Sequence, residues 1–174
     1  MCCSIKSKTT WLYNYSYTTW KSPTLPSKLS RCKALHNSCI RLENVVILKE
    51  GSASGRILKV STLSFLGDVD RLSGRIISQD AGSYNRVIRD SILIVKRFRG
   101  STVGTYVLYS MCRRGLAPKA ILMCKPDPVV ISGIILCNML GVSNIPERVY
   151  EEIPDNVRAV LRCSKNVVEL CFST

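Results

Sequence analysis

Residues 91–115 read Ser91-Ile-Leu-Ile-Val-Lys-Arg-Phe-Arg-Gly-Ser-Thr-Val-Gly-Thr-Tyr-Val-Leu-Tyr-Ser-Met-Cys-Arg-Arg-Gly115. The first six residues, Ser91–Lys96, are mostly apolar and β-branched, which is typical of a buried strand. From Thr102 to Arg114 the apolar residues recur every four positions, which predicts a helix, and Gly115 is a typical stop signal. A strand is therefore expected to lead into a helix, with Gly100 and Ser101 at the junction.

Ser101 lies at the predicted start of this helix. Unpaired backbone N–H groups and the positive end of the helix dipole gather there. Serine and threonine are preferred N-caps in any protein, so a cap is the ordinary interpretation. A serine in this position can also hold an anion, or carry a hydroxyl whose ionised form is stabilised. The local pattern leaves both interpretations open.

The composition predicts one soluble domain. The chain has 174 residues, of which 46% are hydrophobic, enough to fill a single core. The longest apolar run, Val129–Leu136, is too short to span a bilayer. The first residues lack the continuous apolar core of a secretory signal. We therefore expect a cytoplasmic protein that does not contact membranes.

The first 42 residues differ in kind from the rest. They carry seven of the 25 Lys and Arg residues and none of the 12 Asp and Glu residues. We expect residues 1–41 to be a disordered basic extension, a transit-like peptide or a misassigned start, and residues 42–174 to form the folded domain. Aromatic residues between Trp11 and Trp20, interleaved with lysines, also suit single-stranded nucleic acid, the weaker interpretation.

The remaining elements predict an α/β fold. Asp127 is a typical N-cap with Pro128 at the first helical position, and Gly141 is expected to end that helix. A turn is expected at 51–55, with loops at 66–75 and 80–85. Strands are expected at 44–49, 56–63, 76–77, 91–96, 119–124, 147–150, 157–161 and 167–172. Many strands and two main helices without a repeat favour a compact β/β/α layered domain.

Several familiar kinds of site are excluded by residue spacing. The nine cysteines contain no Cys-x-x-Cys pair, and the single histidine is His36, so a zinc or iron–sulfur site within this chain is not expected. Without a histidine in the domain, a Ser-His-Asp triad is excluded. No disulfide is assigned by the spacing. Four cysteines in apolar segments are expected to behave as small buried hydrophobes: Cys112, Cys124, Cys137 and Cys171.

Six sequence blocks follow one another along the domain. They are Gly51-Ser-Ala-Ser-Gly55, Leu63-Ser-Phe-Leu-Gly-Asp-Val-Asp70, Ser73-Gly-Arg-Ile-Ile77, Gly100-Ser-Thr-Val-Gly-Thr-Tyr-Val-Leu-Tyr109, Gly115-Leu-Ala-Pro-Lys-Ala-Ile121 and Pro126-Asp-Pro-Val-Val130. Their order and spacing closely resemble the aconitase X family, in particular the small subunits of archaeal phosphomevalonate dehydratases, which are stand-alone swivel domains. The resemblance covers Leu42–Cys171 and implies a swivelling domain with a β-barrel-like core and helices outside it.

The resemblance also implies an activity. The chain would be the small subunit of a heterodimeric hydro-lyase that dehydrates (R)-5-phosphomevalonate to trans-anhydromevalonate 5-phosphate in the archaeal mevalonate pathway. Ser101 corresponds to the family's proton acceptor. A large subunit would carry a 4Fe–4S cluster that binds the leaving hydroxyl as a Lewis acid, and this chain would hold no metal. The residues expected to contact substrate are Ser64, Gly67, Arg99, Gly100 and Thr102.

Two departures from the family pattern and two alternatives remain open. Related sequences have a Gly-rich approach to the serine, where this chain has Lys96–Arg99, and a second glycine where it has Asp68. One alternative is a hydro-lyase for another hydroxy acid, of the hydroxyproline dehydratase type. The other is a basic nucleic-acid-binding module without catalysis. We further expect the large subunit to meet an apolar face around Leu63–Val69 and Ser101.

Overall fold

The computed structural model describes residues 37–165 and 167–173. Residues 1–36 lie outside the described part, and with them most of the predicted basic extension, His36 and the cysteines at 2, 3 and 32. Strand β1 (Asn37–Leu42) pairs along its whole length with β10 (Val167–Ser173). The sheet therefore begins at Asn37, ahead of the domain boundary expected at Leu42.

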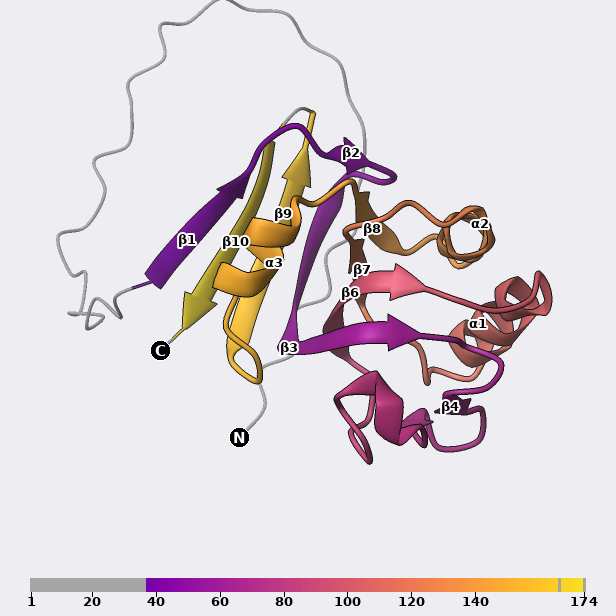
Figure 1. The fold of residues 1–174 in the computed structure, drawn as a ribbon. Helices are drawn as coiled ribbons and strands as arrows, with labels where there is room; N and C mark the ends of the chain where they lie inside the picture. The colour runs from indigo at the N-terminus through magenta and orange to yellow at the C-terminus, as the bar shows by residue number, and fades with distance from the viewer. Residues whose placement is uncertain (1–36, 166, 174) are drawn as a thin grey trace, which may run out of the picture. The chain divides into compact units, whose positions relative to one another are not determined.

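Eight strands form one mixed sheet, in the order β1-β10-β9-β3-β6-β7-β8-β2 (Figure 1). Among the described residues β1 and β2, at the two ends of this order, do not pair with each other. A barrel-like core is thus not confirmed. The other strands of this sheet are β2 (Val46–Ile47), β3 (Gly51–Leu63), β6 (Ser91–Phe98), β7 (Ala120–Met123), β8 (Leu140–Ser143) and β9 (Arg158–Ser164). A separate hairpin pairs β4 (Val69–Asp70) with β5 (Arg75–Ile76).

The long strand β3 joins two kinds of pairing. Its first half, from Gly51 to Arg56, runs antiparallel to β9, and its second half runs parallel to β6. The turn expected at 51–55 is therefore wrong. A Cβ on Gly55 would lie 2.6 Å from the carbonyl oxygen of Asp90. Glycine is needed here because two backbones approach closely, and not because the chain turns.

Two main helices and one short helix complete the fold. The expected first helix is confirmed as α1 (Val103–Arg113), and α2 (Pro128–Leu136) begins as predicted, with Asp127 Oδ1 accepting the N–H of Val130 at 3.0 Å. Gly141 does not end α2 but lies in β8. Asn138, with φ of +52°, supplies the left-handed residue that follows the helix.

The strand expected at 147–150 is also wrong. These residues begin α3 (Glu147–Glu152), directly after Pro146. Tyr150 and Ile153 are both buried, three positions apart, and pack against the same apolar cluster. A glutamate in the first turn suits the positive end of the helix dipole. The apolar contacts on one face therefore select a helix.

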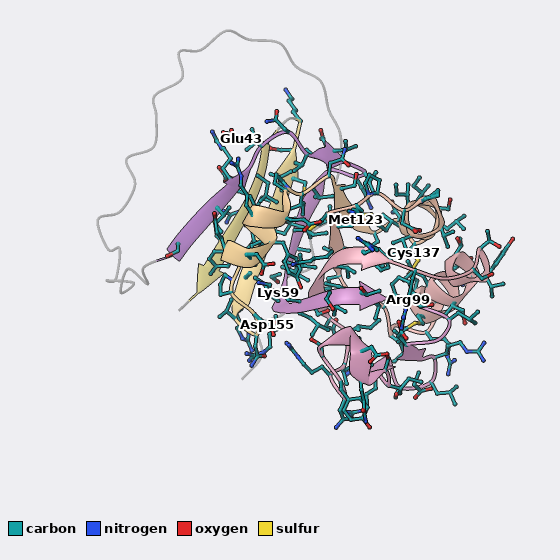
Figure 2. All side chains as sticks on the ribbon, viewed as in Figure 1. Glu43, Lys59, Arg99, Met123, Cys137 and Asp155 are labelled. Carbon is teal, nitrogen blue, oxygen red and sulfur yellow. A yellow bond between two sulfur atoms is a disulfide. The ribbon has the colours of Figure 1, made fainter. Side chains whose placement is uncertain are left out.

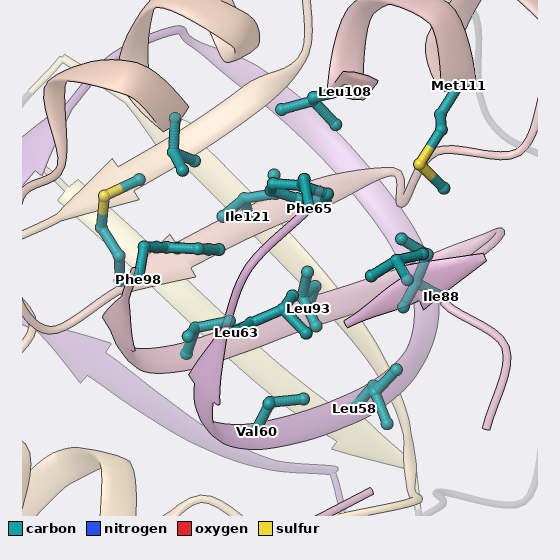
Figure 3. Close-up of a cluster of buried hydrophobic side chains, with 14 of the residues drawn as sticks. Leu58, Val60, Leu63, Phe65, Ile88, Leu93, Phe98, Leu108, Met111 and Ile121 are labelled. Atoms are coloured by element: carbon teal, nitrogen blue, oxygen red, sulfur yellow. The ribbon is translucent and has the colours of Figure 1, made fainter. Parts of the chain in front are cut away.

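Alternate residues of β6 face two separate apolar clusters. Leu93 and Val95 belong to a cluster that α1 and α2 cover, whereas Ile92 and Ile94 face a second cluster that includes α3. Figure 3 shows the first cluster, with Leu108 above the strand that carries Leu93. Strands buried on both faces need cover on both sides. The helices on opposite faces of the sheet supply this cover.

Close contacts hold α1 against α2. A Cβ on Gly133 would lie 2.8 Å from Leu108 Cδ2, so the two helices approach at a glycine. The Thr105 hydroxyl donates to the carbonyl of Val129 at 2.7 Å. A disulfide joins Cys112 of α1 to Cys137, which directly follows α2. Figure 2 labels Cys137 beside these helices.

The disulfides correct the prediction for three cysteines. Cys112, Cys137 and Cys171 are bridged, the last to Cys39 across β1 and β10. Of the described cysteines, Cys124 and Cys163 are free and buried, and burial raises the pKa of each thiol to about 11. These two thiols are therefore unreactive at neutral pH. No helix within residues 37–165 and 167–173 has the length and apolar character to cross a bilayer.

The Cys112–Cys137 bridge generates a prediction about stability. It closes a loop with a sequence separation of 25 residues, for which chain entropy predicts about 3 kcal/mol of stabilisation. We expect Cys112→Ala, Cys137→Ala and the double variant to lose nearly the same free energy of unfolding, because removing either sulfur breaks the same bond. Chemical denaturation of the full chain measures this. Losses that add up in the double variant would contradict a shared bond.

Candidate functional site at the start of α1

Ser101 lies where β6 has ended and α1 begins. Its Oγ accepts the N–H of Val103 at 3.3 Å, and its carbonyl accepts the N–H of Gly104 at 2.9 Å. The side chain is exposed. The N-cap residue of α1 is Thr102, whose side chain makes no capping hydrogen bond, so the cap predicted at Ser101 is displaced by one residue. Ser101 instead supplies a cap-like hydrogen bond from the position before it. Its hydroxyl is also open to a molecule outside the chain, so this hydrogen bond does not exclude a reactive role.

Gly100 sets the position of this serine. Its φ is +123°, a conformation that other residues rarely adopt, and a Cβ here would lie 2.6 Å from Ser64 Oγ. The backbone just before Ser101 therefore rests against the Ser64 hydroxyl. Only glycine allows both the conformation and the contact.

Ser64 is itself held by a tight turn that follows β3. Its side chain is buried, and its Oγ accepts the N–H of Gly67 at 3.4 Å. Its backbone N–H donates to Asp68 Oδ2 at 2.7 Å, while its carbonyl accepts the N–H of Asp68 at 2.9 Å. The buried Asp68 carboxylate thereby fixes the turn on which Gly100 rests.

Arg99 completes this arrangement by pairing with Asp68. Arg99 Nη2 lies 3.1 Å from Asp68 Oδ1, and the Asp68 side chain is only 7% exposed. The hydrogen bond that Arg99 donates to the carboxylate, together with the negative charge of the carboxylate, raises the pKa of Arg99. The arginine is therefore balanced by a carboxylate and is not a free cation beside Ser101. Figure 2 labels Arg99 near α1.

The pairing of Arg99 with Asp68 was not predicted from the sequence. Along the chain the two residues are separate departures from a glycine pattern, but the structure brings them into contact. Their opposite charges were the available signal, because a buried carboxylate needs a partner. Of the other cations near the motif, Arg75 donates to the carbonyl of Asn85 at 2.6 Å, and Arg97 and Lys125 are exposed.

The cavity beside Ser101 is too small for a substrate. Its accessible volume is about 10 Å³, roughly the space of one water molecule. Pockets for small molecules usually enclose about 300–1,000 Å³. A small-molecule substrate would not fit inside this cavity without further walls around it. The lining residues are Phe65, Phe98, Arg99, Gly100, Ser101, Gly104, Asp127, Val129 and Val130.

The structure brings all the sequence-predicted site residues to the same end of the sheet, where β3 and β6 terminate. Crevices at the carboxyl ends of parallel strands are common ligand sites. These predicted site residues are Ser64, Gly67, Arg99, Gly100, Ser101 and Thr102, and their roles in binding and catalysis stay predictions.

Within the described residues no group of three or more His, Cys, Asp or Glu side chains is arranged to hold a metal ion.

The predicted apolar face is only partly present. Leu63, Phe65 and Val69 are buried in the core, whereas Leu66 of the same loop is 43% exposed and Val103, two residues after Ser101, is 45% exposed. Larger apolar side chains are exposed further along α1 and on α2. Tyr106 is 71% exposed and Leu136 is 56% exposed. They line an open groove of about 530 Å³ together with Thr102, Thr105, Pro128, Val129 and Ser132.

Comparisons with known proteins agree with this geometry. A family model described as the aconitase X swivel domain matches residues 42–170. The phosphomevalonate dehydratase small subunit of Methanothrix thermoacetophila is 36% identical over 121 residues, covering 69% of this chain and 88% of that protein. The corresponding protein of Pyrococcus abyssi is 44% identical over 89 residues, covering 51% and 68%.

A solved structure supports the same assignment. The crystal structure of Thermococcus kodakaraensis aconitase X in its holo form matches with a TM-score of 0.68 and 26% identity, and the match covers 75% of this chain and 98% of that one. The family model spans most of the chain, and the likeness extends from sequence to the arrangement of strands and helices. The chain belongs to the aconitase X swivel-domain family.

Proposed function

We propose that this chain is the small subunit of a cytoplasmic dehydratase that converts (R)-5-phosphomevalonate to trans-anhydromevalonate 5-phosphate and water. The observation that carries the proposal is the exposed Ser101 hydroxyl, held at the start of α1 on a backbone that only glycine permits. The match covers most of the length of several curated relatives, and these relatives are named as small subunits of phosphomevalonate dehydratase. Their names support this substrate over a hydroxyproline. The nucleic-acid alternative rests on residues 11–21, outside the described part.

Ser101 would act as the proton acceptor. Dehydration removes a proton from the carbon beside the carboxylate, and the hydroxyl on the neighbouring carbon leaves, so the balance is one water. A serine accepts such a proton only if its oxyanion is stabilised by preorganised donors. The N–H of Val103 already points at Ser101 Oγ, and the start of α1 adds the positive end of the helix dipole. Gly100 and Thr102 would position the substrate against this oxygen.

The iron–sulfur cluster suggested by aconitase X relatives would belong to the large subunit. Two free cysteines are described, Cys124 and Cys163, and both are buried with raised pKa values. These thiols do not fit a cluster, which needs several exposed thiolates. We therefore assign no step of the reaction to a metal on this chain. Its part is to supply the serine and one wall of the pocket.

The large subunit would dock on the groove between α1 and α2. This groove shares Val129 with the lining of the small cavity beside Ser101, and it begins at Thr102. A partner that closes the pocket over Ser101 must contact the adjoining surface. Exposed Tyr106 and Leu136 offer the apolar and aromatic contacts that protein interfaces favour.

Replacing Ser101 tests the catalytic role. With Ser101→Ala we expect the turnover of the reconstituted complex at saturating 5-phosphomevalonate to fall about 10²–10⁴-fold, as for loss of a general base. The free energy of unfolding should fall by only about 0.5–2 kcal/mol, the cost of a lost cap. Ser101→Thr, which keeps a hydroxyl, should give an intermediate rate. A Ser101→Ala complex within threefold of the unmodified rate would leave this serine as a cap only.

Replacing Gly100 tests the contact with Ser64. Gly100→Ala places a Cβ 2.6 Å from Ser64 Oγ at a φ of +123°, so we expect it to lower turnover and thermal stability. Gly115→Ala is the matched control, because its φ is +68° and nothing lies within 4 Å of its Cβ. Adding Ser64→Ala to Gly100→Ala should recover part of the stability by removing the clashing oxygen. Equal effects at Gly100 and Gly115 would contradict a specific contact.

Substitutions in the groove test the docking surface. Tyr106→Ser and Leu136→Ser should each raise the Kd for the large subunit at least tenfold, about 1.4 kcal/mol, as expected for aromatic and apolar anchors. Tyr84→Ser is the control, since Tyr84 is 57% exposed and lies outside the groove lining. Surface plasmon resonance with immobilised large subunit gives the Kd. An unchanged Kd for both groove variants would move the interface elsewhere.

A further inference from the structure

A second cavity lies at the opposite end of the parallel strands from Ser101. It encloses about 510 Å³. Ser101 follows the end of β6, whereas this cavity surrounds the residue just before β6 begins, Asp90, and the residue just before β7 begins, Lys119. Its lining also includes strands β3 and β9. The lining residues are Ser54, Gly55, Arg56, Asp90, Lys119, Arg158, Ala159 and Val160.

Two arginines on neighbouring strands line this cavity. Arg56 of β3 is the direct register partner of Arg158 of β9 in the antiparallel ladder. Directly opposed like charges destabilise a strand pair. Arg56 Nη1 donates to the carbonyl of Asn156 at 2.6 Å. In the described part of the chain, the Arg158 side chain has no hydrogen bond or ion pair.

The cavity lacks enough carboxylates to balance its cations. Asp90 is its one acidic lining residue, and it is shared, with Lys119 Nζ at 3.8 Å and Arg89 Nε at 3.5 Å. The two opposed arginines are left without a carboxylate. Both arginines are exposed, so water and salt screen part of their repulsion, and a bound anion would relieve more of it.

We propose that this cavity binds a small phosphorylated molecule through Arg56, Arg158 and Lys119. A guanidinium group can donate two parallel hydrogen bonds to the oxygens of a phosphate. Two arginines held side by side by the strand register could therefore both bind the same phosphate group. Lys119, directly before β7, adds a third positive charge. The volume lies within the range for small-molecule pockets. A phosphate or diphosphate ester therefore fits better than a nucleic acid, which needs an extended basic groove.

The site is separate from the proposed reaction site. Phe98 at the end of β6 lies against the small cavity beside Ser101, and Ser91 at its beginning lies against the cationic end, where it pairs with Arg56 in the parallel ladder. An anion bound here would hold together the middle of β3, the residue before β6 and the start of β9. It would stabilise the domain without touching Ser101. Its binding is therefore measurable apart from turnover.

Thermal unfolding of the full chain with added anions tests the proposal. At constant ionic strength, we expect inorganic phosphate and pyrophosphate to raise Tm in a saturable way, because a ligand that binds only the folded state stabilises it. Arg158→Gln should abolish this rise. In phosphate-free buffer the same variant should be at least as stable as the unmodified chain, since it removes a like-charge pair.

Arg162→Gln is the matched control. Arg162 lies on the same strand as Arg158, but its register partners are Ser52 and Glu169, and it is outside the cavity lining. It should keep the full response. A larger response to pyrophosphate than to phosphate would indicate a diphosphate ester as the ligand, and the reverse a monophosphate. The proposal fails if Arg158→Gln keeps the rise in Tm or if sodium chloride produces the same rise. It also fails if the chain binds an oligonucleotide but binds neither phosphate nor pyrophosphate.

Discussion

Burial of β6 on both faces is the constraint on which the rest of this structure depends. The four residues from Ile92 to Val95 are completely inaccessible to solvent. A strand of this kind is stable only if apolar layers cover both of its sides. Helices α1 and α2 form one layer, and β9, β10 and α3 contribute to the other. With both faces covered, the strand meets solvent only at its ends, so binding and catalysis are confined to those ends.

The carboxyl end of β6 is arranged to present a serine rather than to enclose a substrate. Asp68 holds the turn at Ser64, and Ser64 supports the backbone of Gly100. The pairing of Arg99 with Asp68 adds to this support from a second strand end. Each contact fixes backbone that precedes α1, so Ser101 is held in place while its hydroxyl stays exposed. A small cavity and a nearby apolar groove are what a subunit needs if its partner supplies the other half of the pocket.

The two ends of the parallel strands have different chemistry. At the carboxyl end, the cation Arg99 is matched by a buried carboxylate. At the amino end, Arg56 and Arg158 face each other without one. Sheet register places Arg56 beside Arg158, whereas the turn that follows β3 brings Asp68 to Arg99. A charge that looks unremarkable along the sequence therefore becomes balanced or unbalanced only after the strands pair.

The sequence by itself determined the elements that depend on near neighbours. Ser91–Lys96 was predicted as a buried strand and 102–114 as a helix, because apolar spacing and a glycine stop act within a few residues. The Asp127 cap was equally local, and the motif order identified the family. The local sequence therefore suffices to predict the junction between strand and helix at Gly100 and Ser101.

Only the tertiary structure decided the rest. Residues 51–55 form a strand because they pair with β9, and 147–152 form a helix because one face packs into a distant apolar cluster. The Cys112–Cys137 bridge exists because two helices meet. Asp68 finds Arg99, and Arg56 faces Arg158, across many intervening residues. Each of these features is a contact between segments that only the fold brings together, and local sequence patterns carry no record of such contacts.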